Sequence, residues 1–547
     1  MIFPKFAGKD ETMIQYPIGI QDFQKIIANN MVYVDKTDLV YQLVSNFGVY
    51  FLSRPRRFGK SLLVSTIKYY FQGRSDLFKG LKIDKLEHNW DQYPVFEIDF
   101  NGKDYTEADA LSDTLELSLT NWESGYGRNA AAKTLGDRFA YVLHQAHVKR
   151  GKQCVVLIDE YDKPLLDVMD TGLKTTVDGN EMTIEERNRN ILKGFYSVFK
   201  LADADLRFVF LTGVTKFAQV SVFSGFNNAR DISMNPDYDA ICGITEDELG
   251  TVFHSSIESL AKANDMSYDE TKQLLKETYD GYHFSKAMTD IYNPFSLLNC
   301  FADKDVNEYW FATATPTYLV RLLAHRHGDM QDIVKGEYRD DEFVNYRVTV
   351  ETPVPMIYQS GYLTIKGYDR RKKRYRLDFP NKEVSSGFLT MEAASYFKND
   401  DNRMSSWVDD ASIALEDGKI DEFHDMLYDF IASIPYSTRF DNSSDSHEKQ
   451  FQYTVFLILR LISSQESLVL HEKENSQGRA DCILETPNFV YIFEFKLDHP
   501  ADEALHQIEA KGYAEPYTHD SRKVYRIGCT FSSETGRVSD WKVEPEG

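Results

Sequence analysis

The sequence has few cysteines and no hydrophobic run long enough to cross a membrane. Its five cysteines lie far apart in 547 residues and include no CxxC pair. That spacing argues against a zinc-finger or disulfide-scaffold protein and is typical of a reducing cytoplasm. The most apolar stretch, residues 454–462, is too short to span a bilayer and contains Arg460, so we expect a buried helix there. Because residues 1–10 have no long apolar core, we expect no signal peptide and a cytoplasmic location.

The sequence also lacks an excess of positive charge. Its formal net charge is −23, which argues against a general nucleic-acid coat protein but leaves room for a local basic groove. Hydrophobic residues make up 42% and aromatic residues 14%, so the chain can form packed cores and is not wholly disordered. At roughly 100–200 residues per domain, the length predicts about three domains, which we place at 1–240, 241–372 and 373–547.

Apolar strands alternate with helices in the first 240 residues. We expect strands at 49–53, 95–100, 155–158 and 208–211, and helices at 60–72, 104–121, 130–150 and 184–201. This alternation predicts an α/β fold with a parallel sheet, and strands this uniformly apolar are typical of a sheet with helices on both faces.

Helical periodicity dominates from about residue 244 to residue 330. Thr245 and Glu248 form a capping-box pattern, and Pro294 is expected in the first turn of a helix. Strand character returns between 356 and 379, where five consecutive basic residues at 370–374 predict the solvated tip of a hairpin. We therefore expect a helical middle region of winged-helix type.

The segment between the first strand and the first helix lacks the first glycine of a phosphate-binding loop. Arg54 occupies that position, but the segment ends in Gly59-Lys60-Ser61, which matches the second half of such a loop. Backbone N–H groups at a helix N-terminus bind phosphates, so Lys60 would neutralise the β and γ phosphates of ATP and Ser61 would bind Mg²⁺. A basic turn without a ligand is the alternative.

A second acidic element follows about 100 residues later. The apolar strand 155–158 ends in Asp159-Glu160, which is the layout of a Walker B motif. Asp159 would bind the metal and Glu160 would polarise the attacking water. The alternative interpretation is a buried strand that ends in two exposed acids. The strand 208–211 ends in Thr212, which we expect to reach the γ-phosphate.

Near the C-terminus, a predicted hairpin brings two acids and a lysine together. Asp481 precedes its first strand, and Glu494 and Lys496 share one face of its second strand because side chains alternate along a strand. Two carboxylates beside an ammonium are costly to bury unless a divalent cation binds them. The arrangement predicts Mg²⁺-assisted cleavage of a phosphodiester, with Asp481 and Glu494 as metal ligands.

Four segments carry a resemblance to a known family. They are Tyr33-Val34-Asp35-Lys36-Thr37, Arg54-Pro55-Arg56-Arg57-Phe58-Gly59-Lys60-Ser61, Leu157-Ile158-Asp159-Glu160-Tyr161-Asp162 and Leu211-Thr212-Gly213-Val214-Thr215-Lys216-Phe217. With them the chain resembles the bacterial AAA-ATPase-like family, whose members typically carry a C-terminal PD-(D/E)XK nuclease-like domain. The resemblance covers nearly the whole chain and implies a P-loop NTPase domain and a restriction-endonuclease-like domain. It also implies ATP and Mg²⁺ as cofactors and DNA as the partner of the C-terminal domain.

The PD-(D/E)XK pattern implies further roles in the C-terminal segment. Lys496 would orient or deprotonate the attacking water, and Glu448 is the candidate for a helical acid that binds the metal. Gln507, on the helix that follows, commonly supports such sites. The alternatives are that Asp481 is a turn acid and that Glu494 and Lys496 form a surface ion pair.

Three arginines have alternative roles. Arg56 and Arg57 would either add positive charge around the phosphates or lie as exposed loop residues. Arg230 would be either an arginine finger or one partner of a surface salt bridge. No role is predicted for residues 161–163, which follow the two acids.

Together, these sites predict ATP-regulated, Mg²⁺-dependent cleavage of nucleic acid, with DNA as the expected substrate. ATP binding would order the chain or assemble a homo-oligomer. The alternative, favoured by the acidic composition and the incomplete loop, is a nucleotide-switched DNA-binding or scaffold protein whose nuclease-like domain does not cut.

Overall fold

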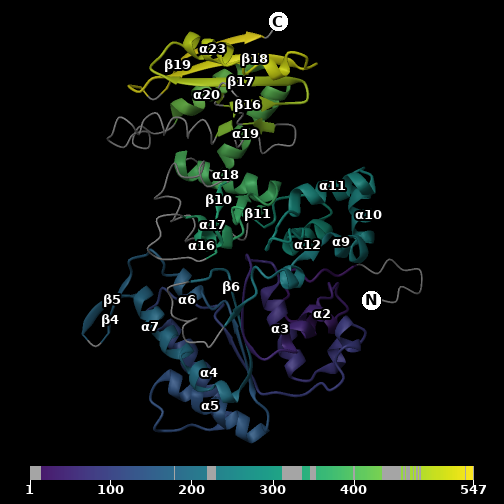
Figure 1. Cartoon of the computed structure of the whole chain (residues 1–547), viewed down its shortest axis with the longest axis vertical. Coiled ribbons are helices and arrows are strands. Elements are labelled where there is room, and N and C mark those ends of the chain that lie inside the picture. Colours follow the sequence, from purple (N-terminus) through teal and green to yellow (C-terminus); the bar gives the residue numbers. More distant parts are fainter. Residues whose placement is uncertain are drawn as a thin grey trace. The chain divides into compact units, whose positions relative to one another are not determined.

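The structure of the protein, a computed structural model, forms two compact units (Figure 1). It describes residues 14–177, 179–217, 229–310, 336–344, 353–397, 401–433, 458–459, 462, 469–471, 474–475, 478–479, 482–535 and 537–545. Unit 1 comprises the described residues up to Glu383, and unit 2 comprises those from Val384 onward.

Unit 1 contains a five-stranded parallel sheet with the strand order β2-β3-β6-β1-β7. Its strands are β1 (Gly48–Ser53), β2 (Val95–Asp99), β3 (Cys154–Asp159), β6 (Leu206–Gly213) and β7 (Arg230–Asp231). Every residue of β3 is buried, as expected near the centre of a sheet that is covered on both faces. Because the strands are parallel, the C-terminal ends of β1, β3 and β6 meet at one edge of the sheet.

Helices cover both faces of this sheet. They are α3 (Lys60–Phe71) on one face and α4 (Ala110–Tyr126), α5 (Leu135–Arg150) and α7 (Ile184–Tyr196) on the other (Figure 1). Phe71 of α3 contacts Phe208 with ring centroids 5.3 Å apart, whereas Phe96 contacts Trp122 of α4 at 5.2 Å. The predicted α/β fold class is therefore confirmed.

Helices α4 and α5 begin later than hydrophobic spacing predicts. A turn precedes α4 because Asp104 accepts hydrogen bonds from the amide and the hydroxyl of Thr106 at 3.0 and 2.6 Å. Thr134 caps α5 by accepting a hydrogen bond from the Asp137 amide at 3.1 Å. Short side-chain-to-backbone bonds therefore set these two boundaries.

Unit 1 contains further helices and strands. Those that precede β6 are α1 (Phe23–Ala28), α2 (Thr37–Val44), α6 (Lys163–Leu166), β4 (Lys174–Val177), β5 (Asn180–Thr183), α8 (Val198–Leu201) and 3-10 helices at Ser75–Phe78, Lys82–Lys85 and Asp203–Asp205. Those that follow β7 are a 3-10 helix at Pro236–Ile241, β8 (Ile244–Thr245), α9 (Glu246–Val252), α10 (His254–Ala263), α11 (Tyr268–Tyr279), β9 (Ile291–Tyr292), α12 (Pro294–Asp303), β10 (Glu337–Tyr338), α16 (Asp340–Phe343), α17 (Val354–Gln359), β11 (Thr364–Asp369) and β12 (Arg374–Asp378).

A largely helical region follows the sheet within unit 1. Its helices α9 to α12 surround a buried cluster that includes Phe253 and Phe301. The capping box of Thr245 and Glu248 and the position of Pro294 at the start of α12 are both as predicted. β11 and β12 form the expected antiparallel hairpin around the basic turn, and the winged-helix type stays a prediction.

Unit 2 contains a mixed five-stranded sheet with the order β13-β16-β17-β18-β19. Its strands are β13 (Val469–His471), β16 (Cys482–Glu485), β17 (Phe489–Leu497), β18 (Lys523–Phe531) and β19 (Val538–Pro545), and two further short strands are β14 (Glu474–Asn475) and β15 (Gly478–Arg479). Its helices are α18 (Lys382–Phe397), which begins in unit 1, α19 (Asp401–Glu416), α20 (Ile420–Ser433), α23 (Ala501–Ala510) and a 3-10 turn at Glu515–Tyr517. β17 and β18 are parallel and joined through α23, whereas the other neighbours are antiparallel.

Both faces of the unit 2 sheet are covered. On one face, Ile483 and Ile492 pack with Ile508 of α23 in a buried cluster. On the other face, the Tyr491 hydroxyl donates a hydrogen bond to the carbonyl of Leu415 in α19 at 2.6 Å. Neighbouring residues of β17 therefore point to opposite layers, as the sequence predicts.

Helix length and apolarity bear on the membrane prediction. In the parts of the chain that the structure describes, no helix is both long and apolar enough to cross a bilayer. The apolar stretch 454–462, predicted as a buried helix, lies largely outside those parts.

Candidate functional site

The loop 54–59, which joins β1 to α3, ends in a glycine with a left-handed backbone. Gly59 has φ 92° and is the N-cap residue of α3, and Arg57 has φ 68°. A residue with a side chain is strained at such a φ, which accounts for glycine at position 59. Because no side chain caps α3, its first-turn amides and the positive end of its dipole can interact with an anion.

Lys60, the first residue of α3, is buried beneath this loop. Its ammonium donates hydrogen bonds to the carbonyl oxygens of Arg54 at 3.0 Å and Pro55 at 3.1 Å, and it lies 3.8 Å from Glu160 Oε1. An ammonium has three N–H donors, so the two carbonyl contacts leave one donor for a carboxylate or a phosphate oxygen.

The ends of β3 and β6 bring a carboxylate and a hydroxyl to the start of α3. Asp159 and Thr212 end neighbouring strands, and Thr212 Oγ1 donates a hydrogen bond to Asp159 Oδ1. The Ser61 side chain, in the first turn of α3, is close enough to the same carboxylate to favour its ionised form. Burial raises the pKa of Asp159, and Ser61 and Thr212 act against that rise. The structure therefore brings Ser61, Asp159 and Thr212 into one polar cluster.

Glu160 follows Asp159 in a turn and has φ 53°, which is uncommon for a residue other than glycine. Its amide donates a hydrogen bond to Asp159 Oδ1 at 3.1 Å, and its side chain, 16% exposed, reaches toward Lys60. Arg57 and Glu160 thus both have unfavourable backbone angles at the same site. Such strain is often found where a functional geometry overrides local preference.

The oxygen atoms of Ser61 and Asp159 fit Mg²⁺, which prefers hard oxygen ligands. Within the described ranges, no group of three or more His, Cys, Asp and Glu side chains is arranged to hold a metal ion. At nucleotide sites Mg²⁺ commonly completes its coordination with phosphate oxygens and water.

Arg54, which occupies the position of the first loop glycine, has a buried side chain that connects the loop to neighbouring backbone. Its guanidinium is buried and donates hydrogen bonds to the carbonyls of Ser53 (2.9 Å), Ser233 (2.8 Å) and Tyr238 (3.1 Å). It also lies 4.0 Å from the ring centroid of Phe284. Burial lowers the pKa of Arg54. Its two terminal nitrogens donate to backbone carbonyls, so the side chain supports the loop conformation.

The other arginines occupy different positions. Arg57 is exposed, and its guanidinium lies 5.0 Å from the ring centroid of Phe295. Arg56 is partly exposed on the same loop. Arg230 is exposed on β7, where its backbone pairs with Tyr50 and thus lies upstream of the loop along the sheet. Arg57 is therefore the loop arginine at the surface beside the open helix N-terminus.

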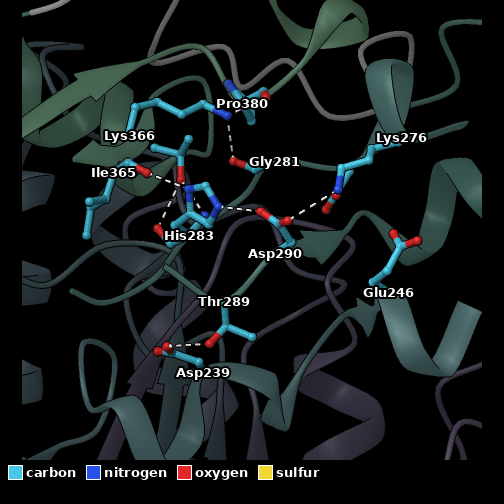
Figure 2. A network of polar contacts seen from close by, with 12 residues as sticks. Asp239, Glu246, Lys276, Gly281, His283, Thr289, Asp290, Ile365, Lys366 and Pro380 are labelled. Carbon is cyan, nitrogen blue, oxygen red and sulfur yellow. Dashed lines mark hydrogen bonds and ion pairs between the residues drawn. The ribbon is translucent and has the colours of Figure 1, made fainter. Parts of the chain in front are cut away.

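A polar network surrounds His283 in the part of unit 1 that follows the sheet (Figure 2). His283 Nδ1 hydrogen-bonds with a carbonyl of β11 at 2.7 Å, and its Nε2 hydrogen-bonds with Asp290 Oδ1 at 2.6 Å. The residues on either side, Tyr282 and Phe284, pack their rings against Phe58 at 4.8 and 5.5 Å. The hydrogen bonds of His283 therefore hold the backbone that carries Tyr282 and Phe284, the two aromatic residues that contact Phe58 of the loop.

Asp162 is a buried site residue for which the sequence predicts no role. Its Oδ2 accepts hydrogen bonds from the amides of Val214 at 3.0 Å and Thr215 at 2.6 Å. Burial and the charge of Glu160 raise the pKa of Asp162 to about 7. Asp162 therefore ties the segment after β3 to the end of β6, close to Thr212. The only sequence signal for it is a third acid shortly after a buried strand.

In unit 2, Glu494, Lys496 and Gln507 lie in mutual contact. Glu494 is 1% exposed, and its Oε1 accepts hydrogen bonds from Lys496 Nζ at 3.0 Å and from Gln507 Nε2. Lys496 also donates to Gln507 Oε1 at 2.7 Å. The amide of Gln507, on α23, thus bridges the two charged residues of β17.

Further polar residues belong to this candidate site. Thr530 of β18 stands beside Lys496 in the strand register and is 2% exposed. Its hydroxyl has no hydrogen-bond partner among the described residues, and the sequence alone gives no signal for it. Asp481 and Glu448, the other predicted metal ligands, lie outside the described residues.

Comparisons with known proteins bear on both units. Residues 17–223 match the family described as "Predicted AAA-ATPase", and residues 446–541 match the "PD-(D/E)XK nuclease superfamily". Over 548 residues, the chain is 33% identical to the "Uncharacterized protein in vnfD 5'region" of Azotobacter chroococcum mcd 1. That alignment covers 97% of this chain and 99% of the relative. The two family matches include the loop before Lys60 and the pair Glu494–Lys496, respectively.

Proposed function

This chain belongs to the AAA-ATPase-like family and has a C-terminal domain of the PD-(D/E)XK nuclease superfamily, and on that premise we propose that it couples ATP hydrolysis to Mg²⁺-dependent DNA cleavage. The proposed ATPase domain spans residues 1–240, the middle region 241–372 and the nuclease domain 373–547. The observation that carries the proposal is the cluster at the start of α3, where Lys60 and Ser61 lie beside Asp159 and Glu160.

The residues of this cluster have separate roles in the proposed ATPase reaction. Gly59 and the first-turn amides of α3 bind the phosphates, together with Lys60 and Arg57. Ser61 and Asp159 hold Mg²⁺, which would neutralise charge on the phosphate oxygens when bound. Glu160 accepts a proton from the attacking water, and Thr212 holds the Asp159 carboxylate in place. The contacts of Lys60 with the carbonyls of Arg54 and Pro55 support this assignment, because they orient the ammonium with neutral acceptors while its nearest carboxylate oxygen, on Glu160, is 3.8 Å away.

Unit 2 supplies the proposed cleavage site. Glu494 and Asp481 hold Mg²⁺ there, with Glu448 as a further ligand, and the bound cation would polarise the phosphodiester. Lys496 orients the attacking water, and Gln507 fixes both Glu494 and Lys496. The antiparallel register supports Asp481 as the second carboxylate, since the residue after it pairs with the residue before Glu494.

A plasmid-nicking assay tests the proposal. The full chain is incubated with supercoiled DNA, Mg²⁺ and ATP, and we expect nicked and linear products. Asp481→Asn and Glu494→Gln should each lower the rate by at least about 100-fold. Glu503→Gln, which changes a carboxylate on α23 that is 57% exposed, is the matched control and should cut at the wild-type rate.

The same assay separates the proposal from its alternative. If the wild-type protein hydrolyses ATP but never cuts DNA with any nucleotide, the chain is a nucleotide-switched DNA-binding or scaffold protein. The net charge of −23 favours the scaffold form of that alternative, because an acidic chain repels the DNA backbone. Measuring the mass of the assembly with and without ATP would show whether nucleotide binding forms a homo-oligomer.

A further inference from the structure

Trp310 reaches the phosphate loop 54–59 from a distant part of unit 1. Its indole Nε1–H donates a hydrogen bond to the carbonyl of Arg56 at 3.0 Å, although the two residues are 254 positions apart. The side chain is fully buried. An indole N–H can only donate, and a buried one needs an acceptor, so this contact fixes both the ring and the loop carbonyl.

The backbone of Trp310 is itself held by a buried carboxylate. The amide of Trp310 donates to Glu383 Oε1 at 2.6 Å, and the Ser296 hydroxyl donates to Glu383 Oε2 at 2.8 Å. Glu383 is 1% exposed. Burial raises the pKa of Glu383 to about 7, and both hydrogen bonds act against that rise. Two successive hydrogen bonds thus connect Arg56 through Trp310 to Glu383, which lies in the first turn of α18.

A second contact holds the adjacent loop residue. Gly361 has φ 93°, and a Cβ atom there would lie 2.6 Å from Pro55 Cβ, so the position admits only glycine. Tyr362, the next residue, packs its ring 5.1 Å from the ring of Trp310. The carbonyl of Pro55 is one of the two that accept hydrogen bonds from Lys60. Trp310 and the segment 361–362 therefore support consecutive loop residues from one side.

We infer that Trp310 is a positioning residue of the proposed nucleotide site, whose indole N–H sets the backbone of the phosphate loop by holding the Arg56 carbonyl. Trp310 acts through the loop and does not touch the nucleotide. The inference rests on the proposed ATP site. It adds a contact that holds the loop conformation in the absence of the first loop glycine, namely the hydrogen bond from Trp310 to the Arg56 carbonyl. Arg54 holds the start of the loop through its hydrogen bonds to backbone carbonyls, and Trp310 holds the loop two residues later, at the Arg56 carbonyl.

The test uses the full chain with the substitution Trp310→Phe, which retains an aromatic ring and removes the N–H donor. Without that donor the Arg56 carbonyl loses its hydrogen-bond partner in Trp310, and we expect ATP to bind about tenfold more weakly by calorimetry. The matched control is Trp407→Phe, because the Trp407 indole also donates to a backbone carbonyl, that of Met426 at 3.3 Å, but in unit 2. Its ATP affinity should equal that of the wild type.

Tryptophan fluorescence gives a readout that a purely structural role would not change. ATP should alter the emission of the wild type and of Trp407→Phe, and this response should be absent in Trp310→Phe. A second variant, Glu383→Gln, should weaken ATP binding less than Trp310→Phe, because a glutamine oxygen still accepts from the Trp310 amide.

The outcomes distinguish the inference from the function on which it depends. If the wild type binds ATP and Trp310→Phe binds it within twofold of wild type, the positioning role is refuted while the ATP site stands. If Trp310→Phe fails to fold, a wild-type emission spectrum that ATP does not change refutes the role instead. A wild type that binds no ATP overturns the proposed function and the inference together.

Discussion

Each candidate site pairs a lysine with a glutamate, but the surroundings of the two lysines differ. In unit 1, Lys60 rests on two neutral carbonyls, and its closest carboxylate oxygen, on Glu160, is 3.8 Å away. In unit 2, Lys496 lies 3.0 Å from Glu494 and is also bound by Gln507. The Lys60 side chain is 4% exposed and the Lys496 side chain is 25% exposed.

This difference suits the two sites to ligands of opposite charge. Neutral carbonyls orient the Lys60 ammonium without cancelling its charge, so the site attracts a phosphate. The ion pair of Lys496 and Glu494 is neutral as a whole, and its buried carboxylate is the group that a cation would share. These surroundings support the proposed roles, in which Lys60 would bind a phosphate and Lys496 would be a positioned donor beside a metal.

The largest expected effect comes from removing each lysine in turn. Lys60→Ala should weaken ATP binding by at least about 100-fold, because a buried charged donor to the phosphates is lost. Lys496→Ala should leave ATP affinity unchanged and lower plasmid nicking by at least about 100-fold. Calorimetry with ATP and a gel assay with supercoiled DNA measure the two effects on the same preparations.

Matched controls come from lysines that form ion pairs on the same elements or in the same unit. Lys68 of α3 pairs with Glu97 at 2.6 Å, and Lys542 of β19 pairs with Asp502 at 2.6 Å. Lys68→Ala and Lys542→Ala should change neither readout. The comparison between the sites fails if Lys496→Ala weakens ATP binding as much as Lys60→Ala does.

A smaller effect, on the rate of ATP hydrolysis, is expected from Thr212, whose hydroxyl donates to the Asp159 carboxylate. Thr212→Val keeps the shape of the side chain and removes the hydroxyl that donates to Asp159. We expect kcat for ATP hydrolysis to fall about tenfold with KM nearly unchanged, since Thr212 positions a catalytic carboxylate and does not bind the loop. Thr212→Ser should restore most of the rate. A rise in KM at constant kcat would contradict this role.

Local features of unit 1 could be predicted from the sequence. The apolar runs gave the strands of the parallel sheet, and Gly59-Lys60-Ser61 gave the helix N-terminus, because each depends on neighbouring residues alone. The acids Asp159 and Glu160 could also be predicted, because they directly follow an apolar run that forms a strand. In the structure every residue of β3 is buried, which agrees with the uniformly apolar run in its sequence.

The supports of the loop could not be predicted, because they come from distant segments. Arg54 binds carbonyls about 180 residues away, and the partner of Arg56 is Trp310. No spacing rule connects such residues, and an arginine at a loop position suggests a phosphate contact more readily than a buried brace. The sequence predicts no role for Asp162 for the same reason, since its partners Val214 and Thr215 lie about 50 residues away, directly after β6.

The smallest expected effect is a change in the pH dependence of stability, and it concerns Asp280, a buried carboxylate at the C-terminal end of α11 in unit 1. Burial raises the pKa of Asp280 to about 7, with Asp290 and Glu246 adding to the rise and the Gly281 backbone amide and Lys276 opposing it. Asp280 also follows the C-terminus of α11, where the helix dipole disfavours a negative charge.

Folding therefore takes up a proton at Asp280 between about pH 4 and pH 7, since the unfolded chain releases it near the model-peptide pKa of roughly 3.9. The stabilising contribution of this group is complete below pH 4 and is lost as the pH rises to 7. Asp280→Asn should remove that dependence, so the stability of the variant relative to the wild type should rise between about pH 4 and pH 7, by at most about 1.4 kcal/mol per pH unit, and level off above pH 7. Thermal unfolding of both proteins across this range measures the difference. Asp269→Asn, which changes an exposed acid on the same helix, should keep the wild-type slope, and parallel curves for Asp280→Asn would show that Asp280 is already ionised in the folded chain.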